Sequence, residues 1–354
     1  MLKFGLVGCG RIAKRHSELL GLGQIKGACL AAVCDIDFGK AQEIGNTYSI
    51  PAYSDVHKMM QSEKIDVVVV LTESGNHAKN VLELAGYGKH IMVEKPMALT
   101  LSDADAMIEA CDRSGIKLFV IKQNRFNVPV VKLHEALLQG RFGKLVLGTV
   151  RVRWCRPQSY YDQASWRGTW ALDGGVLTNQ ASHHIDMLEW MLGDVESVFA
   201  MGVTAVANIE AEDTAVVTLR FKNGALGVVE ATTAARPTDL EGSISILGEG
   251  GTVEIAGFAV NQMKTWKFVK PQVGDEDVME LYSVNPPNVY GFGHAAYYDH
   301  AVDCIMNNTQ HLVDGLVGRK SLELISAIYE SIETGREVYL RFKPSHCRLG
   351  IGGS

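Results

Sequence analysis

The chain of 354 residues has no apolar run long enough to cross a bilayer, no internal repeat and no excess of positive charge. A membrane-spanning helix needs about 20 consecutive apolar residues, so we expect no membrane partner. The formal net charge of −6 argues against a broad surface for nucleic acid. The first strand pattern starts at the N-terminus, so we expect no signal peptide.

The sequence also has no C-x-x-C pair, and its seven cysteines are scattered. Paired cysteines are typical of secreted domains, whereas an odd number of dispersed thiols favours a reducing compartment. We therefore expect a cytoplasmic protein whose cysteines serve as small buried apolar residues. With 47% hydrophobic and 21% charged residues the chain can bury large cores, and its length suggests two domains.

A turn from Gly8 to Ala13 follows the first strand pattern and has the form G-x-G-x-x-A. In such turns the first glycine allows a sharp bend, the second lets the backbone approach a pyrophosphate, and the third small residue lets the helix pack on the strand. The free N–H groups of the helix start favour an anion. A second strand ends at Asp35, where an acid would hold the adenosine ribose and repel a 2′-phosphate. The pattern predicts a dinucleotide site that prefers NAD to NADP.

Residues 1–122 alternate strand and helix patterns, which predicts an α/β domain with a doubly wound parallel sheet, the Rossmann arrangement. The run Ile65–Leu71 is β-branched throughout, as a strand covered on both faces should be. The ligand of such a sheet lies beyond the carboxyl ends of its strands. Three further segments follow strands there, and they are 72–77, 94–96 and 123–125.

Lys95 stands out at this edge because it lies between an acid and a proline directly after an apolar strand. Proline restricts the preceding residue to extended conformations, so the lysine has a defined direction. A lysine near the positive ring of a cofactor can be tuned toward proton transfer, which we favour over a simple Glu94–Lys95 pair. For His77, contact with the cofactor and exposure to solvent are equally compatible with the pattern.

Residues 123–354 form the second predicted domain, with closely spaced strand patterns and few helices. Asn223-Gly224 between two of these strands is a strong hairpin signal. The segment predicts an α+β domain with an open, mostly antiparallel sheet whose free face would meet another subunit.

An insertion between residues 151 and 170 of this domain contains four arginines and three tryptophans. Arginine forks suit phosphate and carboxylate groups, although a surface arginine belt is the alternative. Farther along, His183 and His184 precede Asp186, but the spacing lacks a third convincing metal ligand, so we expect no metal. A histidine at a helix start is better placed as a general acid or base.

Nearly the whole chain resembles the Gfo/Idh/MocA family of NAD(P)-dependent oxidoreductases. The resemblance rests on the glycine turn, the Glu94-Lys95-Pro96 triplet and the segment from Gly174 to His183. The resemblance implies that Lys95 and His183 lie by the nicotinamide. The family's aspartate is Asn179 here, which argues against the branch of inositol dehydrogenases. The stretches RPxxYY, WRGTW and NQASHHIDML look most like the branch of UDP-N-acetyl-2-amino-2-deoxyglucuronate 3-dehydrogenases.

That branch implies NAD-dependent oxidation of the 3-hydroxyl of UDP-GlcNAc uronate in the synthesis of diacetamido-uronic acid for lipopolysaccharide O-antigen, by a homotetramer. His183 would be the base and Lys95 would polarise the oxygen, or the two roles would be exchanged, while Asn179 would orient substrate or His183. His184 is the alternative base. The sequence leaves open another sugar or polyol dehydrogenase, a non-catalytic NAD-binding regulator, and reoxidation of NADH in place by a second substrate such as 2-oxoglutarate.

The expected cofactor contacts lie in the glycine turn, at the strand ends and in the insertion: Gly8, Gly10, Arg11, Ile12, Asp35, Thr72, Asn76, His77, Glu94, Lys95, Gln123, Trp166 and Arg167. The expected substrate contacts are Lys95, Arg153, Tyr160, Tyr161, Thr178, Asn179, His183, Tyr290 and His294. Which arginine meets which phosphate or carboxylate cannot be assigned from the residues alone.

Overall fold

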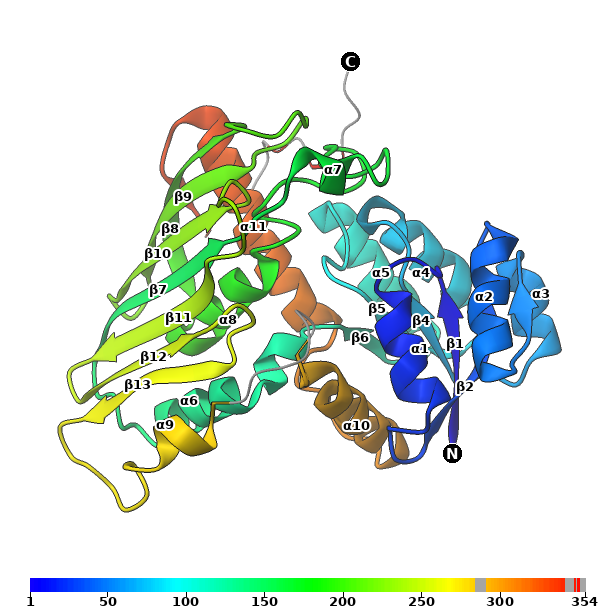
Figure 1. Cartoon of the computed structure of the whole chain (residues 1–354), viewed down its shortest axis with the longest axis horizontal. Coiled ribbons are helices and arrows are strands. Elements are labelled where there is room, and N and C mark those ends of the chain that lie inside the picture. Colours follow the sequence, from blue (N-terminus) through cyan, green and yellow to red (C-terminus); the bar gives the residue numbers. More distant parts are fainter. Residues whose placement is uncertain (284–290, 341–346, 348, 351–354) are drawn as a thin grey trace. The chain divides into compact units, whose positions relative to one another are not determined.

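The structure is a computed structural model that describes residues 1–283, 291–340, 347 and 349–350 (Figure 1). The chain forms two compact units. Unit 1 comprises Met1–Lys122 and His294–Lys320, and unit 2 comprises Gln123–Gly293 and Ser321–Ser354. Within the described ranges no helix has both the length and the apolar character needed to span a membrane.

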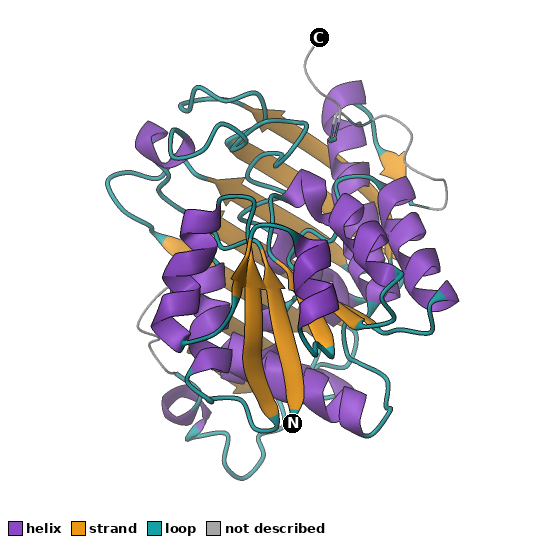
Figure 2. Ribbon diagram, turned by 90° about the vertical axis from the view of Figure 1, so that its right-hand side faces the viewer, coloured by secondary structure: helices purple, strands orange, loops and turns teal. Residues whose placement is uncertain are grey.

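Unit 1 is built on a six-stranded parallel sheet with the order β3-β2-β1-β4-β5-β6. Its strands are β1 (Leu2–Val7), β2 (Ala28–Cys34), β3 (Ala52–Tyr53), β4 (Val67–Val70), β5 (His90–Val93) and β6 (Leu118–Val120). The intervening helices are α1 (Ala13–Gly21), α2 (Phe38–Tyr48), α3 (Val56–Ser62), η1 (Ser74–Asn76), α4 (His77–Ala85) and α5 (Leu101–Arg113). Figure 2 shows helices on both sides of the strands that face the viewer.

The central strand of this sheet explains why it is covered on both faces. All four valines of β4 have no exposed surface, and burying each such side chain contributes about 1.5–3 kcal/mol. Two of the unit 1 helices start at side-chain caps: the Asp37 carboxylate accepts from the Gly39 N–H at α2, and the Thr100 hydroxyl accepts from the Asp103 N–H at α5. The predicted doubly wound parallel sheet is confirmed.

Residues 294–320 belong to unit 1, whereas the expected division placed them in the second domain. Helix α10 (Gly293–Met306) buries its apolar side on the first sheet, where the ring of Tyr298 meets Phe4 edge-on at 5.6 Å. The chain then joins the edge of this sheet, and the Val120 N–H donates to the Val313 carbonyl. Helix α11 (Gly315–Thr334) begins in unit 1 and continues in unit 2. Sequence periodicity cannot show which of two sheets an apolar helix face will cover.

Unit 2 contains an eight-stranded sheet with the order β13-β12-β11-β7-β10-β9-β8-β14. Every neighbouring pair is antiparallel except β7 and β10, which confirms the predicted mostly antiparallel sheet. The strands are β7 (Leu145–Arg153), β8 (Val195–Val203), β9 (Thr214–Phe221), β10 (Leu226–Thr232), β11 (Glu241–Gly248), β12 (Gly251–Ala256), β13 (Gln262–Phe268) and β14 (Val338–Tyr339). The helices are η2 (Gln123–Phe126), α6 (Val128–Leu138), α7 (Gln158–Tyr161), α8 (Ser182–Leu192) and α9 (Val278–Leu281).

Helix α8 lies against the inner face of this sheet and is buried on almost every side. The contact is close because Gly148 of β7 has no side chain: a Cβ there would come within 2.7 Å of both Leu188 and Leu192. The strands alternate buried and exposed residues, as a sheet covered on one face should. The opposite face, called the outer face below, carries exposed apolar side chains, which are Phe199, Met201, Val203, Val216 and Leu226.

Candidate functional site

The carboxyl ends of the parallel strands line up at one edge of unit 1, called the ligand edge below. Val7 is in register with Cys34 and with Val70, and Val70 is in register with Val93. The segments that follow these strands are the glycine turn, Asp35, Thr72–His77 and Glu94–Pro96, so the structure brings these predicted residues together.

The glycine turn has the geometry that a dinucleotide needs. Gly8 has a φ of +96°, and a Cβ there would lie 2.7 Å from the main chain of Leu71, so this position requires glycine. A Cβ on Gly10 would meet nothing within 4 Å. Protein packing therefore does not demand glycine at this position, whereas a ligand approaching the backbone would. Arg11 is exposed and Ile12 half-buried beside it. No side chain caps the start of α1, where the N–H groups of Ala13 and Arg15 donate to the carbonyls of Gly10 and Ile12.

Asp35 closes the turn through its carboxylate. Oδ2 accepts a hydrogen bond of 2.6 Å from the Cys9 N–H, and Oδ1 accepts one of 2.8 Å from the Asp37 N–H. The side chain is half-buried, so it is not a plain solvated strand end. A carboxylate held next to the pyrophosphate turn fits an NAD ribose, and no arginine follows it to receive a 2′-phosphate.

His77 connects two loops of the ligand edge. Its Nδ1 lies 2.7 Å from the Pro96 carbonyl and its Nε2 lies 3.0 Å from the Thr72 carbonyl. Burial lowers the pKa of His77, against the effect of both carbonyls, and a neutral ring carries a single N–H that donates to one of the two carbonyls at a time. The side chain is 1% exposed. His77 therefore holds the two loops together, and exposure to solvent, the alternative that the pattern allowed, does not occur.

The other cofactor candidates at this edge make local hydrogen bonds. The Thr72 hydroxyl donates to Asn80, and the Asn76 amide donates to Glu73. Lys95 is half-buried, and its main-chain N–H donates to its neighbour Glu94, which is buried. Gln123, the first residue of unit 2, is buried in η2, and its side-chain oxygen has no hydrogen-bond partner among the described residues.

In unit 2 two adjacent histidines are both buried, with 7% of His183 and 1% of His184 exposed. Both lie in the first turn of α8, about 100° apart around the helix axis, as 3.6 residues per turn requires. His184 faces the sheet: its ring meets Trp154 edge-on at 6.0 Å, and neither ring nitrogen finds a partner in the described part of the chain. Burial lowers the pKa of His184 to about 3. This environment suits a packed neutral ring and favours His183 as the reacting histidine.

The segment before α8 is fixed by a buried polar network. Oε1 of Glu212 accepts from the Leu177 N–H and from the Tyr329 hydroxyl, each at 2.9 Å. Thr178, a predicted substrate contact, is fully buried with its hydroxyl 2.8 Å from that of Tyr329. Thr178 therefore supports the turn from inside. Asn179 is half-buried at the end of the turn, and its amide donates to Asp173.

Asp186 is the partner of an arginine. Its two oxygens accept from Nε and Nη2 of Arg125, both at 2.8 Å, and both side chains are almost fully buried. The guanidinium also lies over the ring of Trp190 at 4.7 Å. This bidentate pair joins η2 to the helix that carries His183.

The four arginines of the insertion divide into paired and unpaired ones. Arg153 makes two hydrogen bonds to Glu230 at 2.6 and 2.7 Å on the outer face of the sheet, opposite α8, which argues against its predicted contact with substrate. Arg156 pairs with Asp239 at 2.9 Å, and Arg151 lies 3.7 Å from Glu241. Arg167 alone has no acidic partner among the described residues.

Arg167 is held instead by aromatic rings. Its guanidinium lies 4.5 Å from the ring centre of Tyr160 and 4.6 Å from that of Trp166, and it donates to the Tyr160 hydroxyl at 2.8 Å. A stacked guanidinium without a carboxylate is ready to receive an anion. Neighbouring Tyr161 is buried, with its hydroxyl 2.9 Å from that of Thr233, and so supports the fold.

Two remaining candidates stand apart. His294 is 1% exposed and lies in unit 1 beside Glu94, which favours a structural contact over contact with a sugar. Tyr290 lies outside the described residues. Sequence reasoning missed Asp173, His16 and Tyr298; the signal for His16 is a polar residue three positions after Ala13, on the side of α1 that packs on the sheet.

The chain is similar to known oxidoreductases over nearly its whole length. Residues 2–122 match the GFO/IDH/MocA profile described as an oxidoreductase family NAD-binding Rossmann fold. Residues 134–340 match the companion profile, described as the C-terminal alpha/beta domain of that oxidoreductase family.

Named relatives and solved structures extend this similarity. Myo-inositol 2-dehydrogenase of Thermotoga maritima is 31% identical, over 79% of this chain and 82% of its own. A D-apiose dehydrogenase of Paraburkholderia graminis is 27% identical, over 96% of this chain and 90% of its own. The WlbA dehydrogenase from Bordetella pertussis, crystallised with NADH and UDP-GlcNAcA, is 41% identical over 96% of this chain and 98% of its own, with a TM-score of 0.87. WlbA from Chromobacterium violaceum, with the same two ligands, is 41% identical over 96% and 95%, with a TM-score of 0.89.

Proposed function

The chain belongs to the Gfo/Idh/MocA oxidoreductase family, and from this premise we propose that it oxidises the 3-hydroxyl of UDP-GlcNAc uronate. At the coarser level it is an NAD-dependent dehydrogenase of sugar or polyol hydroxyls. The observation that carries the finer proposal is the 41% identity to two WlbA dehydrogenases crystallised with NADH and UDP-GlcNAcA. The named inositol and apiose dehydrogenases share only 31% and 27%.

The residues at the ligand edge fit NAD. The open space beside Gly10, the N–H groups at the start of α1 and the carboxylate of Asp35 would hold the pyrophosphate and ribose. When bound, NAD would supply the acceptor for the hydride that leaves C3 of the sugar. The protein then has to remove the proton of the 3-hydroxyl, so that the alcohol becomes a ketone.

We propose that His183 accepts this proton and that Lys95 polarises the oxygen. In the alternative, Lys95 accepts the proton and His183 polarises the oxygen. The packing of the His184 ring against Trp154 supports His183. Asn179 cannot titrate, and its Nδ2 donates a hydrogen bond to Asp173, which fixes the plane of its amide. Asn179 would therefore orient the reactants.

We propose that Arg167 binds an anionic group of the cofactor or of the substrate. Its guanidinium is positioned by Tyr160 and Trp166 and lacks a carboxylate among the described residues, while Arg153 and Arg156 are neutralised by acids. Its anion could belong to the cofactor or to the sugar nucleotide, and both are rich in phosphate.

The outer face of the unit 2 sheet supports an assembly of several copies. Exposed Phe199, Met201 and Val216 lie on neighbouring strands, and we propose that they pack face to face with another subunit in a homotetramer. We further propose a cytoplasmic enzyme that serves the synthesis of diacetamido-uronic acid for lipopolysaccharide O-antigen. The proposal allows two fates for NADH: release from the enzyme, or reoxidation in place with 2-oxoglutarate as the oxidant.

A substrate panel tests the function. Purified protein, supplied with NAD, is assayed for NADH absorbance with UDP-GlcNAc uronate, UDP-GlcNAc, myo-inositol and D-apiose. We expect turnover with the uronate at a kcat/KM well above the others. Higher kcat/KM on inositol or apiose would assign another sugar or polyol specificity. Binding of NAD with no turnover on any of the four, tested with and without 2-oxoglutarate, would favour a non-catalytic regulator.

A further inference from the structure

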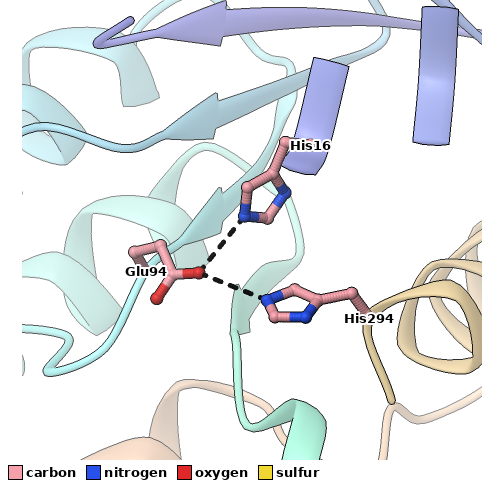
Figure 3. A group of neighbouring side chains, drawn as sticks. All are labelled: His16, Glu94 and His294. Atoms are coloured by element: carbon pink, nitrogen blue, oxygen red, sulfur yellow. Dashed lines mark hydrogen bonds and ion pairs between the residues drawn. The ribbon is translucent and has the colours of Figure 1, made fainter. Parts of the chain in front are cut away.

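A buried carboxylate at the ligand edge connects three elements of unit 1 (Figure 3). Glu94 follows β5 directly and is 7% exposed. Its Oε1 lies 3.2 Å from Nε2 of His16 on α1 and 3.9 Å from Nε2 of His294 at the start of α10. Both histidines are buried as well, and their rings meet edge-on at 5.4 Å. The carboxylate is therefore enclosed by groups that can donate hydrogen bonds to it.

The second oxygen of Glu94 points along the chain. Oε2 accepts a hydrogen bond of 2.9 Å from the main-chain N–H of Lys95. One carboxylate thus contacts the helix that follows the glycine turn through Oε1 and the backbone of the candidate catalytic lysine through Oε2. Any shift of Glu94 would be passed to the position from which the lysine side chain starts.

The position of each proton in these hydrogen bonds can be deduced from the groups that the bonds join. Nδ1 of His16 lies 2.7 Å from the Tyr298 hydroxyl. An ionised carboxylate only accepts, so Nε2 of His16 must carry the proton that faces Glu94. In the neutral ring Nδ1 is then an acceptor, and it receives the Tyr298 O–H. Tyr298 donates to His16 and His16 donates to Glu94, while the Lys95 N–H donates to Glu94 from the other side, so the hydrogen bonds converge on the carboxylate.

The charges agree with this arrangement. Burial acts to raise the pKa of Glu94, but the two histidines outweigh it and hold the pKa well below the ordinary value, so the group is an anion. Burial lowers the pKa of His16, so its ring is neutral. The ligand atoms of Glu94, His16 and His294 lie within 4.8 Å of one another, close enough to suggest a metal. Hydrogen bonds already occupy these atoms: Nδ1 of His16 pairs with Tyr298, Nε2 of His16 with Oε1 of Glu94, and Oε2 of Glu94 with the Lys95 N–H. These pairs favour a hydrogen-bond network over a metal site.

We propose that Glu94 is a positioning residue for Lys95, and that His16 and Tyr298 hold its carboxylate in place. The role rests on the proposed function, in which Lys95 acts on the hydroxyl that is oxidised. Misplacing a reacting group by about 1 Å can cost about 100-fold in rate, so an anchored main chain at Lys95 would matter to kcat more than to cofactor affinity.

The test uses the full-length protein and four variants: Glu94→Leu, Glu94→Gln, Lys95→Ala and the double variant Glu94→Leu/Lys95→Ala. Leucine has a similar size but no acceptor, whereas glutamine keeps an oxygen for the Lys95 N–H. We expect Glu94→Leu to lower kcat by up to about 100-fold with little change in NAD affinity, and Glu94→Gln to keep most of the activity. In the double variant Glu94→Leu should add almost nothing to Lys95→Ala, because both act through one group.

Two controls separate positioning from stability. His16→Phe removes the hydrogen bond that His16 donates to Glu94, and this variant tests the proposal if Glu94→Leu does not fold. His311→Asn is the matched control, because His311 is another buried histidine of unit 1 whose Nδ1 accepts from the Val313 N–H and which, within the described residues, makes no hydrogen bond to Glu94. We expect it to leave kcat unchanged.

Equal losses from Glu94→Leu in the wild type and in Lys95→Ala would overturn the proposal, as would unchanged kcat in Glu94→Leu. Stoichiometric zinc in the purified protein, lost in Glu94→Leu, would replace it with a metal site. Failure of the proposed function is a different outcome: the wild type would then turn over inositol or apiose rather than the uronate, and the same variants would be compared on that substrate.

Discussion

The side-chain amide of Asn179 donates a hydrogen bond to a carboxylate oxygen of Asp173, whose other oxygen accepts from the Gly168 N–H at 2.8 Å. The resemblance to the family places an aspartate where this chain has Asn179. An aspartate at that position would face the carboxylate of Asp173, which is 2% exposed. The asparagine is thus matched to its neighbour, and the departure from the family pattern has a local electrostatic reason.

The first prediction concerns this pair. Asn179→Asp should lower both Tm and kcat, because two carboxylates in contact in a buried site repel each other. The exchanged pair Asp173→Asn/Asn179→Asp restores one donor and one acceptor and should recover much of the lost Tm. Thermal unfolding and kcat across pH 6–9 measure the effect. A fully active, fully stable Asn179→Asp would show that the two groups are not coupled.

The second prediction concerns the reacting groups. Lys95→Ala and His183→Ala should each lower kcat by about 10²–10⁴-fold with NAD binding largely kept, because general acid–base groups contribute that much. His184→Ala should chiefly lower Tm, since its ring is packed against Trp154. A rise in KM at unchanged kcat would reassign Lys95 or His183 to substrate binding. Near-normal turnover of His183→Ala beside an inactive His184→Ala would move the base by one residue.

The third prediction concerns cofactor choice. NADH should bind more tightly than NADPH, because the Asp35 carboxylate repels a 2′-phosphate. Asp35→Asn keeps an acceptor for the Cys9 N–H and removes the charge, so it should narrow the difference between the two cofactors. Asp37→Asn is the control, since Asp37 caps α2 through Gly39 and should not affect the choice. Fluorescence titration decides it, and tighter binding of NADPH by the wild type would contradict it.

The fourth prediction concerns pH and stability. Burial raises the pKa of Glu212 to about 7, against its hydrogen bonds from Leu177 and Tyr329. The folded protein therefore keeps this proton up to about pH 7, whereas the unfolded chain loses it near pH 4.5. The free energy of unfolding should then fall as pH rises between these values, by about 3 kcal/mol in total for a shift of this size.

Glu212→Gln should remove this dependence, because the amide oxygen still accepts from Leu177 and Tyr329 and no charge forms. We expect the variant to be more stable than the wild type at pH 8, with the difference shrinking toward pH 4.5. Urea unfolding at several pH values measures it. A variant that is less stable than the wild type at pH 8 would show that the carboxylate is needed in its ionised form.

The fifth prediction concerns assembly. A lysine at Met201, which is 69% exposed on the outer face, should disrupt the proposed contact between subunits, because the charge would have to be buried. Leu22→Lys is the matched control, an apolar residue 62% exposed in unit 1. Light scattering should show smaller particles for Met201→Lys only. A wild-type protein that is a stable monomer at micromolar concentration would contradict the proposed assembly.

The amino-acid sequence by itself determined the parts of this protein that depend on local pattern. The β-branched run before Thr72 specified a covered parallel strand, and the glycine turn with Asp35 specified the ligand edge and NAD. These signals are local because the period of apolar residues, the conformation of glycine and the order of strands and helices are all written in short stretches. The two-sheet fold and the cofactor followed from them.

Only the tertiary structure decided which polar groups meet. Arg153 and Glu230 are 77 residues apart and face each other because β7 and β10 are neighbours on one sheet. His16 lies 78 residues before Glu94 and 282 residues before Tyr298. Ion pairs and buried hydrogen bonds depend on strand register and helix placement over such separations, and no local pattern encodes them. For this reason the arginines could not be assigned from the sequence, and the anchoring of Lys95 emerged only from the fold.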